Sequence, residues 1–200
     1  MALKAPQSNI HWNYFLALEE DFGVTTRYIE PCKENERTFS IELSRLIMAS
    51  AQETDVLFKC LCENISPGCD ASSVGEYYKI FKNHLPQLFE VEVHLERYPI
   101  SAVPFLSWSD NASPEWWTAN NKIKHHRSTE FRKANMENAI KALSALLVLN
   151  IYYFKSEMQK INNRKIEWFK VTEYLAPESK YFYHDQKYYL KNIKSGAIDW

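Results

Sequence analysis

The chain has 200 residues, 46% of them apolar and 24% charged, which is ordinary for a soluble globular protein. Its formal net charge of −1 excludes a globally basic nucleic-acid binder. This length suits one domain, with or without an appendage, and a glycine count of only 4 favours helices over a many-turned β fold.

From the residues we expect no targeting segment and no membrane span. Its start, Met1–Pro6, lacks the apolar core of a signal peptide. The longest apolar run, Leu143–Phe154, is shorter than the roughly 20 residues that a membrane span needs. We therefore expect a cytoplasmic protein with no membrane partner, whose four cysteines are reduced thiols.

Apolar residues at helical spacing predict most of the secondary structure. The predicted helices are His11–Ile29, Thr38–Asn64, Ser72–His84, Trp116 to about His126, and Asn135–Ile161. Ser113, Pro114 and Glu115 form a good helix start, with Ser113 as the N-cap candidate and Pro114 at the first position. The last helix is apolar nearly all round, so it is either central to the core or at a subunit interface.

Two segments depart from this helical pattern. Residues 89–96 alternate apolar and polar, which predicts a half-buried strand. After Asn162 the chain becomes rich in aromatic residues, and Tyr181–Leu190 is expected to form a small hairpin. We predict a mainly α fold: a bundle of four to five helices at 1–163 with a short β element, and an aromatic C-terminal extension at 164–200 packed on it.

The most informative feature is the segment from Trp116 to Arg127. From Lys122 to Lys133 the chain has five Lys/Arg, two His and one acid, Glu130. Cleavage of RNA without a metal needs proton transfers and cations around the phosphate. His125 and His126 would supply the proton transfers, and the lysines and arginines would supply the cations. The alternative interpretation is a solvated helix end, because the dipole favours cations at the C-terminus of a helix with no chemistry involved.

Carboxylates on the second predicted helix form another candidate site. Glu53 falls on the apolar stripe of that helix, where a charge needs a partner or a polar cavity. One interpretation is that Glu53 orients an imidazole from the region before the last helix. The alternative is a buried salt bridge to Arg45 or Lys124, with Asp55 simply exposed.

Two further motifs have a functional and a structural interpretation. Cys60, Cys62 and Cys69 suggest zinc, but Cys-x-Cys spacing is unusual for a structural site, and buried thiols are favoured. Trp116 and Trp117 would either stack on bases or pack into the core, and the first turn of a helix favours the core. We expect no metal and no cofactor.

The order of these segments resembles the HEPN superfamily, small all-α proteins of toxin–antitoxin and phage-defence systems. It is most similar to a bacterial and prophage-associated group with the segment Trp-Trp-x-x-x-Asn-Lys-x-Lys-His-x-Arg, here Trp116 to Arg127. The likeness also covers His11–Phe15 and the helix from Ser40 through Glu53 and Asp55. It implies a helical bundle that acts as a homodimer.

In HEPN ribonucleases, an Arg, a polar residue, a short spacer and a His precede the final helix, and two protomers form one composite site. The resemblance gives Asn121 and His125 these catalytic positions, with Lys124 and Glu53 beside them. Asn120 stands where the family has Arg, so Lys124 or Arg127 would supply the missing cation. Asn120, Lys122, His126 and Arg127 would hold phosphate or RNA.

Two functional hypotheses follow from these residues. The first is a HEPN-like, metal-independent endoribonuclease that uses His125, with RNA and an antitoxin or defence-system protein as partners. The second is a non-catalytic HEPN-like module that binds a protein or nucleotide partner, because Asn120 replaces the signature Arg. The first predicts His125 in a cleft near Glu53 at a two-fold interface. The second predicts a buried or merely structural His125 and no convergent cations across a dimer.

Overall fold

The computed structural model describes Lys4, residues 9–167, Val171 and residues 179–184, and this part of the chain is mainly helical. Its α-helices are α1 (Ile10–Thr25), α2 (Ile41–Ile65), α3 (Val74–His84), α4 (Glu115–His125), α5 (Arg127–Glu130) and α6 (Met136–Asn162). Short 3-10 turns are η1 (Lys33–Asn35), η2 (Pro86–Glu90) and η3 (Phe131–Lys133). The strands are β1 (Val93–Leu95), β2 (Ser101–Ala102) and β3 (Phe182–His184).

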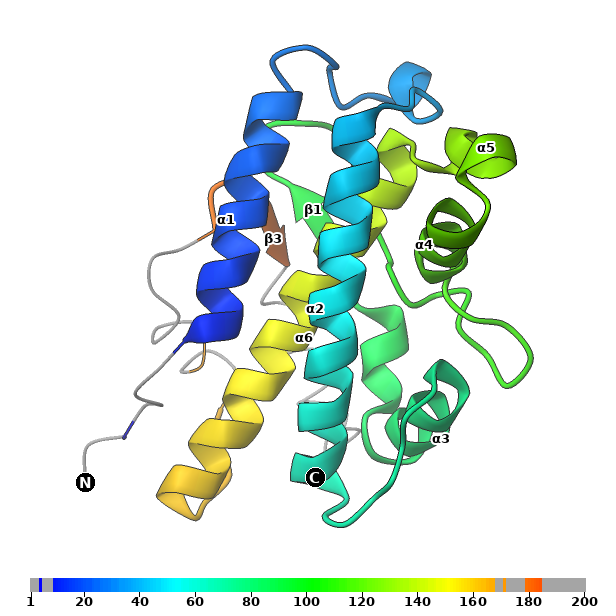
Figure 1. Cartoon of the computed structure of the whole chain (residues 1–200). Helices are drawn as coiled ribbons and strands as arrows, with labels where there is room; N and C mark the ends of the chain where they lie inside the picture. The colour runs from blue at the N-terminus through cyan, green and yellow to red at the C-terminus, as the bar shows by residue number, and fades with distance from the viewer. Residues whose placement is uncertain (1–3, 5–8, 168–170, 172–178, 185–200) are drawn as a thin grey trace.

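The helices form a bundle around the pair α2 and α6, which cross and pack against each other (Figure 1). Helix α1 contacts both on one side, α4 contacts both on the other, and α3 packs on α2. Every residue of α6 from Ala142 to Tyr152 is buried. The last helix was expected either at the centre of the core or at a subunit interface. It occupies the centre of the core, because elements of its own chain cover its apolar faces.

The long helices begin where the sequence provides polar caps. Ser40 accepts the backbone N–H of Leu43 at 3.1 Å, so α2 starts at Ile41, three residues after the predicted Thr38. Asn135 accepts the N–H of Asn138 at 3.0 Å and caps α6. At α3, Ser73 and Glu76 form a reciprocal capping box.

The start of α4 differs from the prediction. Pro114 is the N-cap residue, and no side chain of that position caps the helix. Instead, the hydroxyl of Ser107 accepts the N–H of Glu115 at 3.2 Å. Ser107, a loop residue eight positions before Glu115, thus replaces the expected cap Ser113. A sequence pattern of neighbouring residues does not indicate such a contact.

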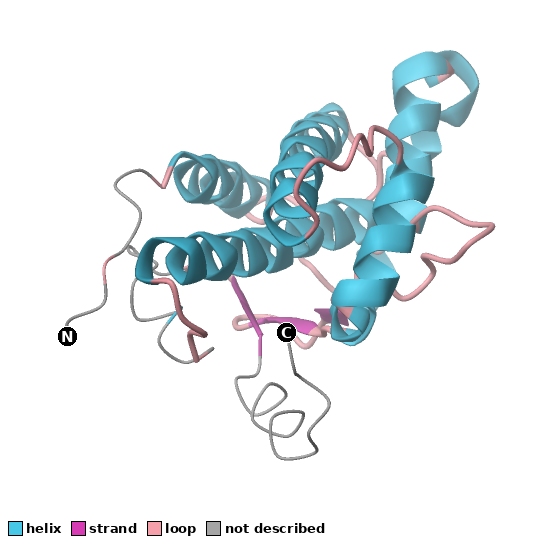
Figure 2. Cartoon of the chain, turned by 90° about the horizontal axis from the view of Figure 1, so that it is seen from below, coloured by secondary structure: helices cyan, strands magenta, loops and turns pink. Residues whose placement is uncertain are grey.

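A small antiparallel sheet in the order β2-β1-β3 lies on one side of the helices (Figure 2). Val93 of β1 is in register with Ala102 on one side and with His184 on the other. The predicted strand at 89–96 is confirmed only for Val93–Leu95, because its first residues belong to the 3-10 turn η2. Pro86 opens that turn, and its fixed φ suits it.

The described C-terminal residues 179–184 are held on α1 and β1. Glu19 is 1% exposed and accepts the backbone N–H groups of Lys180 and Tyr181, each at 2.9 Å, and the hydroxyl of Ser179. The phenol of Tyr181 lies over Gly23, where an added Cβ would come within 2.5 Å of its oxygen. Packing of Tyr181 therefore explains a glycine inside a predicted helix. The rest of the expected hairpin, 185–190, lies outside the described residues.

Candidate functional site

Buried residues along one side of α4 anchor it to the bundle. Trp116, Ala119 and Ile123 are at most 2% exposed, and the indole N–H of Trp116 donates to the carbonyl of Pro104 at 2.9 Å. The prediction that Trp116 packs into the core rather than stacking on bases is confirmed. Trp117 is partly buried and contacts the ring of Phe58. This anchoring turns the opposite side of α4 to solvent.

The predicted catalytic and phosphate-binding residues lie on that outer side and at the C-terminal end of α4. The side chains of Lys122, Lys124, His125, His126 and Arg127 are all exposed, and we call them the α4 cationic surface. His126 caps the helix by donating its N–H to the carbonyl of Lys122 at 2.8 Å. Asn121 is also exposed, whereas Asn120 is half-buried.

The α4 cationic surface makes few contacts with the rest of the chain. Among the described residues, no ion pair or side-chain hydrogen bond involves Lys122, Lys124 or His125. Arg127 approaches the sulfur of Met48 at 3.4 Å. Nearby, Lys133 lies 3.8 Å from the carboxylate of Glu130. These exposed side chains are thus open to an external anion.

Glu53 has a different partner from the ones predicted. Its Oε1 atom lies 2.5 Å from Nδ1 of His11, and the two side chains are 15% and 19% exposed. The imidazole that Glu53 orients therefore comes from the first turn of α1, not from the region before the last helix. Arg45, the alternative partner, pairs instead with Asp21 and Glu42 at 2.9 Å each. Sequence reasoning missed this pair because 42 residues separate its members.

The second carboxylate on α2 has a structural role. Asp55 pairs with Lys59 at 2.5 Å and accepts the hydroxyl of Tyr77 at 3.3 Å. Burial, followed by the charge of Asp55, raises the pKa of the Tyr77 phenol above its usual range. Asp55 is consequently only partly exposed, and it ties α3 to α2.

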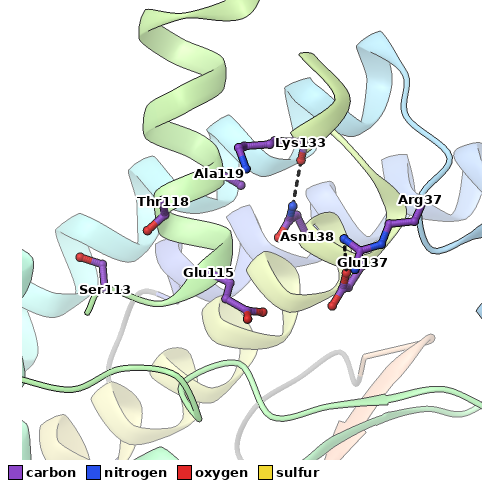
Figure 3. Close-up of a pocket in the computed structure, with 8 residues that line it drawn as sticks. All are labelled: Arg37, Ser113, Glu115, Thr118, Ala119, Lys133, Glu137 and Asn138. Carbon is purple, nitrogen blue, oxygen red and sulfur yellow. Dashed lines mark hydrogen bonds and ion pairs between the residues drawn. The ribbon is translucent and has the colours of Figure 1, made fainter. Parts of the chain in front are cut away.

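A polar pocket of about 320 Å³ opens beside the first turns of α4 and α6 (Figure 3). Its lining residues are Arg37, Ser113, Glu115, Thr118, Ala119, Lys133, Glu137 and Asn138. Arg37 pairs with Glu137 at 3.1 Å, and Lys141 bridges Glu137 and Glu115 at 2.8 and 2.5 Å. Because Thr118 precedes Lys122 by one helical turn, the pocket lies next to Lys122, at one edge of the α4 cationic surface.

The structure describes all four cysteines. All four are free thiols, and within the described residues no group of three or more His, Cys, Asp or Glu side chains is arranged to hold a metal ion. Cys62 is buried, and this burial raises the pKa of its thiol to about 12. The expectation of a buried structural thiol is therefore confirmed for Cys62, while Cys60 is partly exposed beside His11.

Comparison of the chain with models of protein families, with characterised proteins and with solved structures finds no match. Within the described residues, none of the helices has both the length and the apolar character required to span a membrane. Evidence on function thus comes from the arrangement of the side chains themselves.

Proposed function

We propose that this chain is a HEPN-like protein that binds RNA through the α4 cationic surface and cleaves it without a metal when two copies meet. The observation that carries the proposal is the exposure of Lys122, Lys124, His125, His126 and Arg127 together at one helix end. Within the part of the chain that the structure describes, Lys122 and Lys124 form no ion pair, so none has to be broken when they bind a phosphate backbone.

The chemistry assigned to each residue follows from its position. His125 would transfer protons at the 2′-hydroxyl and the leaving oxygen, while Lys124 and Arg127 would stabilise the charged phosphate. In-line cleavage needs a base and an acid on opposite sides of the phosphorus, and His125 and His126 are adjacent residues at the same end of α4. A second copy would bring another His125, and this is why we propose a homodimer.

A non-catalytic module that binds RNA, a nucleotide or a protein is the second candidate. It is favoured by Asn120, which stands in place of the signature Arg and is half-buried. It is also favoured by Glu53, whose carboxylate already holds His11. Under this candidate the α4 cationic surface binds a partner, and His125 performs no proton transfer.

Binding and cleavage measured separately distinguish the candidates. Labelled single-stranded RNA is titrated with the protein by fluorescence anisotropy at several salt concentrations, and its integrity is followed with EDTA present. Lys124→Ala should reduce the slope of log affinity against log salt by about 1, since one phosphate contact is lost. Lys79→Ala, which removes an exposed lysine of α3, is the matched control and should leave the slope unchanged.

His125→Ala should slow cleavage by at least about 100-fold and leave binding within a few-fold of the wild type. RNA that is bound but stays intact would favour the non-catalytic candidate. RNA that is neither bound nor cut refutes both uses of this surface.

The biological setting proposed for the protein is cytoplasmic, as a toxin or phage-defence component with an antitoxin or defence-system partner. Expression in a bacterial host tests it: wild type should slow growth and His125→Ala should not. Harmless expression of the wild-type chain contradicts a toxin role.

A further inference from the structure

Three chemically distinct side chains meet between α1 and α2, away from the α4 cationic surface. Glu53 and Cys60 are seven residues apart on α2, so they lie on the same face, separated by about 10 Å along the axis. His11, in the first turn of α1, reaches between them. Its Nδ1 atom lies 2.5 Å from Oε1 of Glu53, and its ring lies next to the Cys60 thiol.

The order of these groups is carboxylate, imidazole, thiol. Because Glu53 occupies Nδ1 of His11, Nε2 is the ring nitrogen left to accept the proton of the thiol. The contact with Cys60, and next those with Glu53, raise the pKa of His11 above its usual value, although partial burial opposes them. An imidazole next to a thiol can accept its proton as the sulfur attacks.

Side chains of α6 also lie close to His11 and its neighbours. The ring of Tyr153 meets the His11 ring edge-on, with centroids 5.2 Å apart and planes at 88°. One turn further along α6, Glu157 accepts the amide of Asn64 at 2.7 Å and lies 3.6 Å from Lys160. Tyr153 therefore fixes the orientation of the imidazole, and the charges of Glu157 and Lys160 are paired with each other.

Solvent exposure distinguishes Cys60 from Cys62, the other cysteine of α2. His11 and Glu53 remain 19% and 15% exposed, and Cys60 is partly exposed. Cys62, two residues further on, is 1% exposed. A small reagent in solution can thus reach the sulfur that has the imidazole, and is excluded from the one that lacks it.

We infer that Cys60 is a nucleophilic thiol, with His11 as its base and Glu53 as the positioning carboxylate, and that it forms mixed disulfides with small disulfides such as glutathione disulfide. This inference does not depend on RNA binding or cleavage. It assigns to the α1–α2 junction a reversible covalent modification.

The reaction balances with the small disulfide as oxidant. The Cys60 proton passes to His11, and the thiolate attacks one sulfur of glutathione disulfide. A protein–glutathione S–S bond forms while the S–S bond of the reagent breaks, and the second glutathione leaves as a thiolate that takes the proton from His11. A reduced thiol reverses the exchange and restores Cys60.

The test uses the full chain and its own cysteines as references. The protein is incubated with glutathione disulfide, or briefly with iodoacetamide, at pH 5–9, and each cysteine is quantified by peptide mass spectrometry. At pH 7 we expect Cys60 to react about 10-fold faster than Cys32, which is also partly exposed but lies beside the carboxylate of Glu34. Equal rates, with the same pH midpoint for both thiols, overturn the inference.

Variants assign the roles. His11→Asn should lower the Cys60 rate at pH 7 to that of Cys32 and leave it nearly unchanged at pH 9, a pH above the ordinary thiol pKa of about 8.5, where a neighbouring base gives less advantage. Glu53→Gln should cause a smaller loss, and Glu42→Gln, an exposed glutamate on the same helix, none. Circular dichroism confirms folding of each variant. If Glu53→Gln and Glu42→Gln give the same rate profile, the carboxylate has no positioning role, and the wild-type profile alone still decides whether Cys60 is activated.

Discussion

Replacing Glu19 by glutamine tests how the C-terminal segment is held on the bundle. The carboxylate is 1% exposed and accepts backbone N–H groups from Lys180, Tyr181 and Phe182, the last at 3.4 Å. Hydrogen bonds to a charged acceptor stabilise by about 1.5–3 kcal/mol each, and those to a neutral one by about 1 kcal/mol. Each of the three contacts should therefore weaken by about 1 kcal/mol, so Glu19→Gln should lower the free energy of unfolding by about 3 kcal/mol.

Urea unfolding followed by circular dichroism measures this cost, with Glu20→Gln as the matched control. Glu20 is the next residue and pairs with the side chain of Lys180 at 3.3 Å, but 68% of its side chain is exposed. Its replacement should change the free energy of unfolding by less than about 0.5 kcal/mol. If Glu19→Gln and Glu20→Gln unfold at the same urea concentration, the buried carboxylate does not anchor residues 179–182.

Two other predictions concern glycines and pH. Gly23→Ala places a Cβ within 2.5 Å of the Tyr181 hydroxyl and should lower the free energy of unfolding by about 1–3 kcal/mol. Gly75→Ala, with nothing within 4 Å, should raise it by up to about 1 kcal/mol; thermal melts of both variants check the pair, and equal shifts would contradict the Tyr181 contact. Because the pKa of His11 is raised on folding from 6.5, the proton on His11 stabilises the fold below about pH 6.5, and this contribution is lost as the pH rises through the folded-state pKa. The difference in unfolding free energy between wild type and His11→Asn should thus be larger at about pH 5.5 than at about pH 8.5, and a difference independent of pH would refute the link.

The sequence by itself predicted features that depend on neighbours along the chain. Helical periodicity placed α2, α3 and α6 within a few residues of their observed bounds. The burial of Trp116 followed the same local rules. The exposure of His125 and the lysines around it is equally local, because the dipole at the end of a helix favours cations there.

Only the tertiary structure decided which distant groups meet. Glu53 pairs with His11 rather than with a residue near the last helix, since the packing of α1 on α2 brings the two together. The same holds for Glu19, whose partners lie about 160 residues away, and for the cap of α4 at Ser107. Charge and hydrogen-bonding capacity are written in the residue types, but a carboxylate accepts any donor that packing places within about 3 Å, and the order of residues along the chain does not specify that distance.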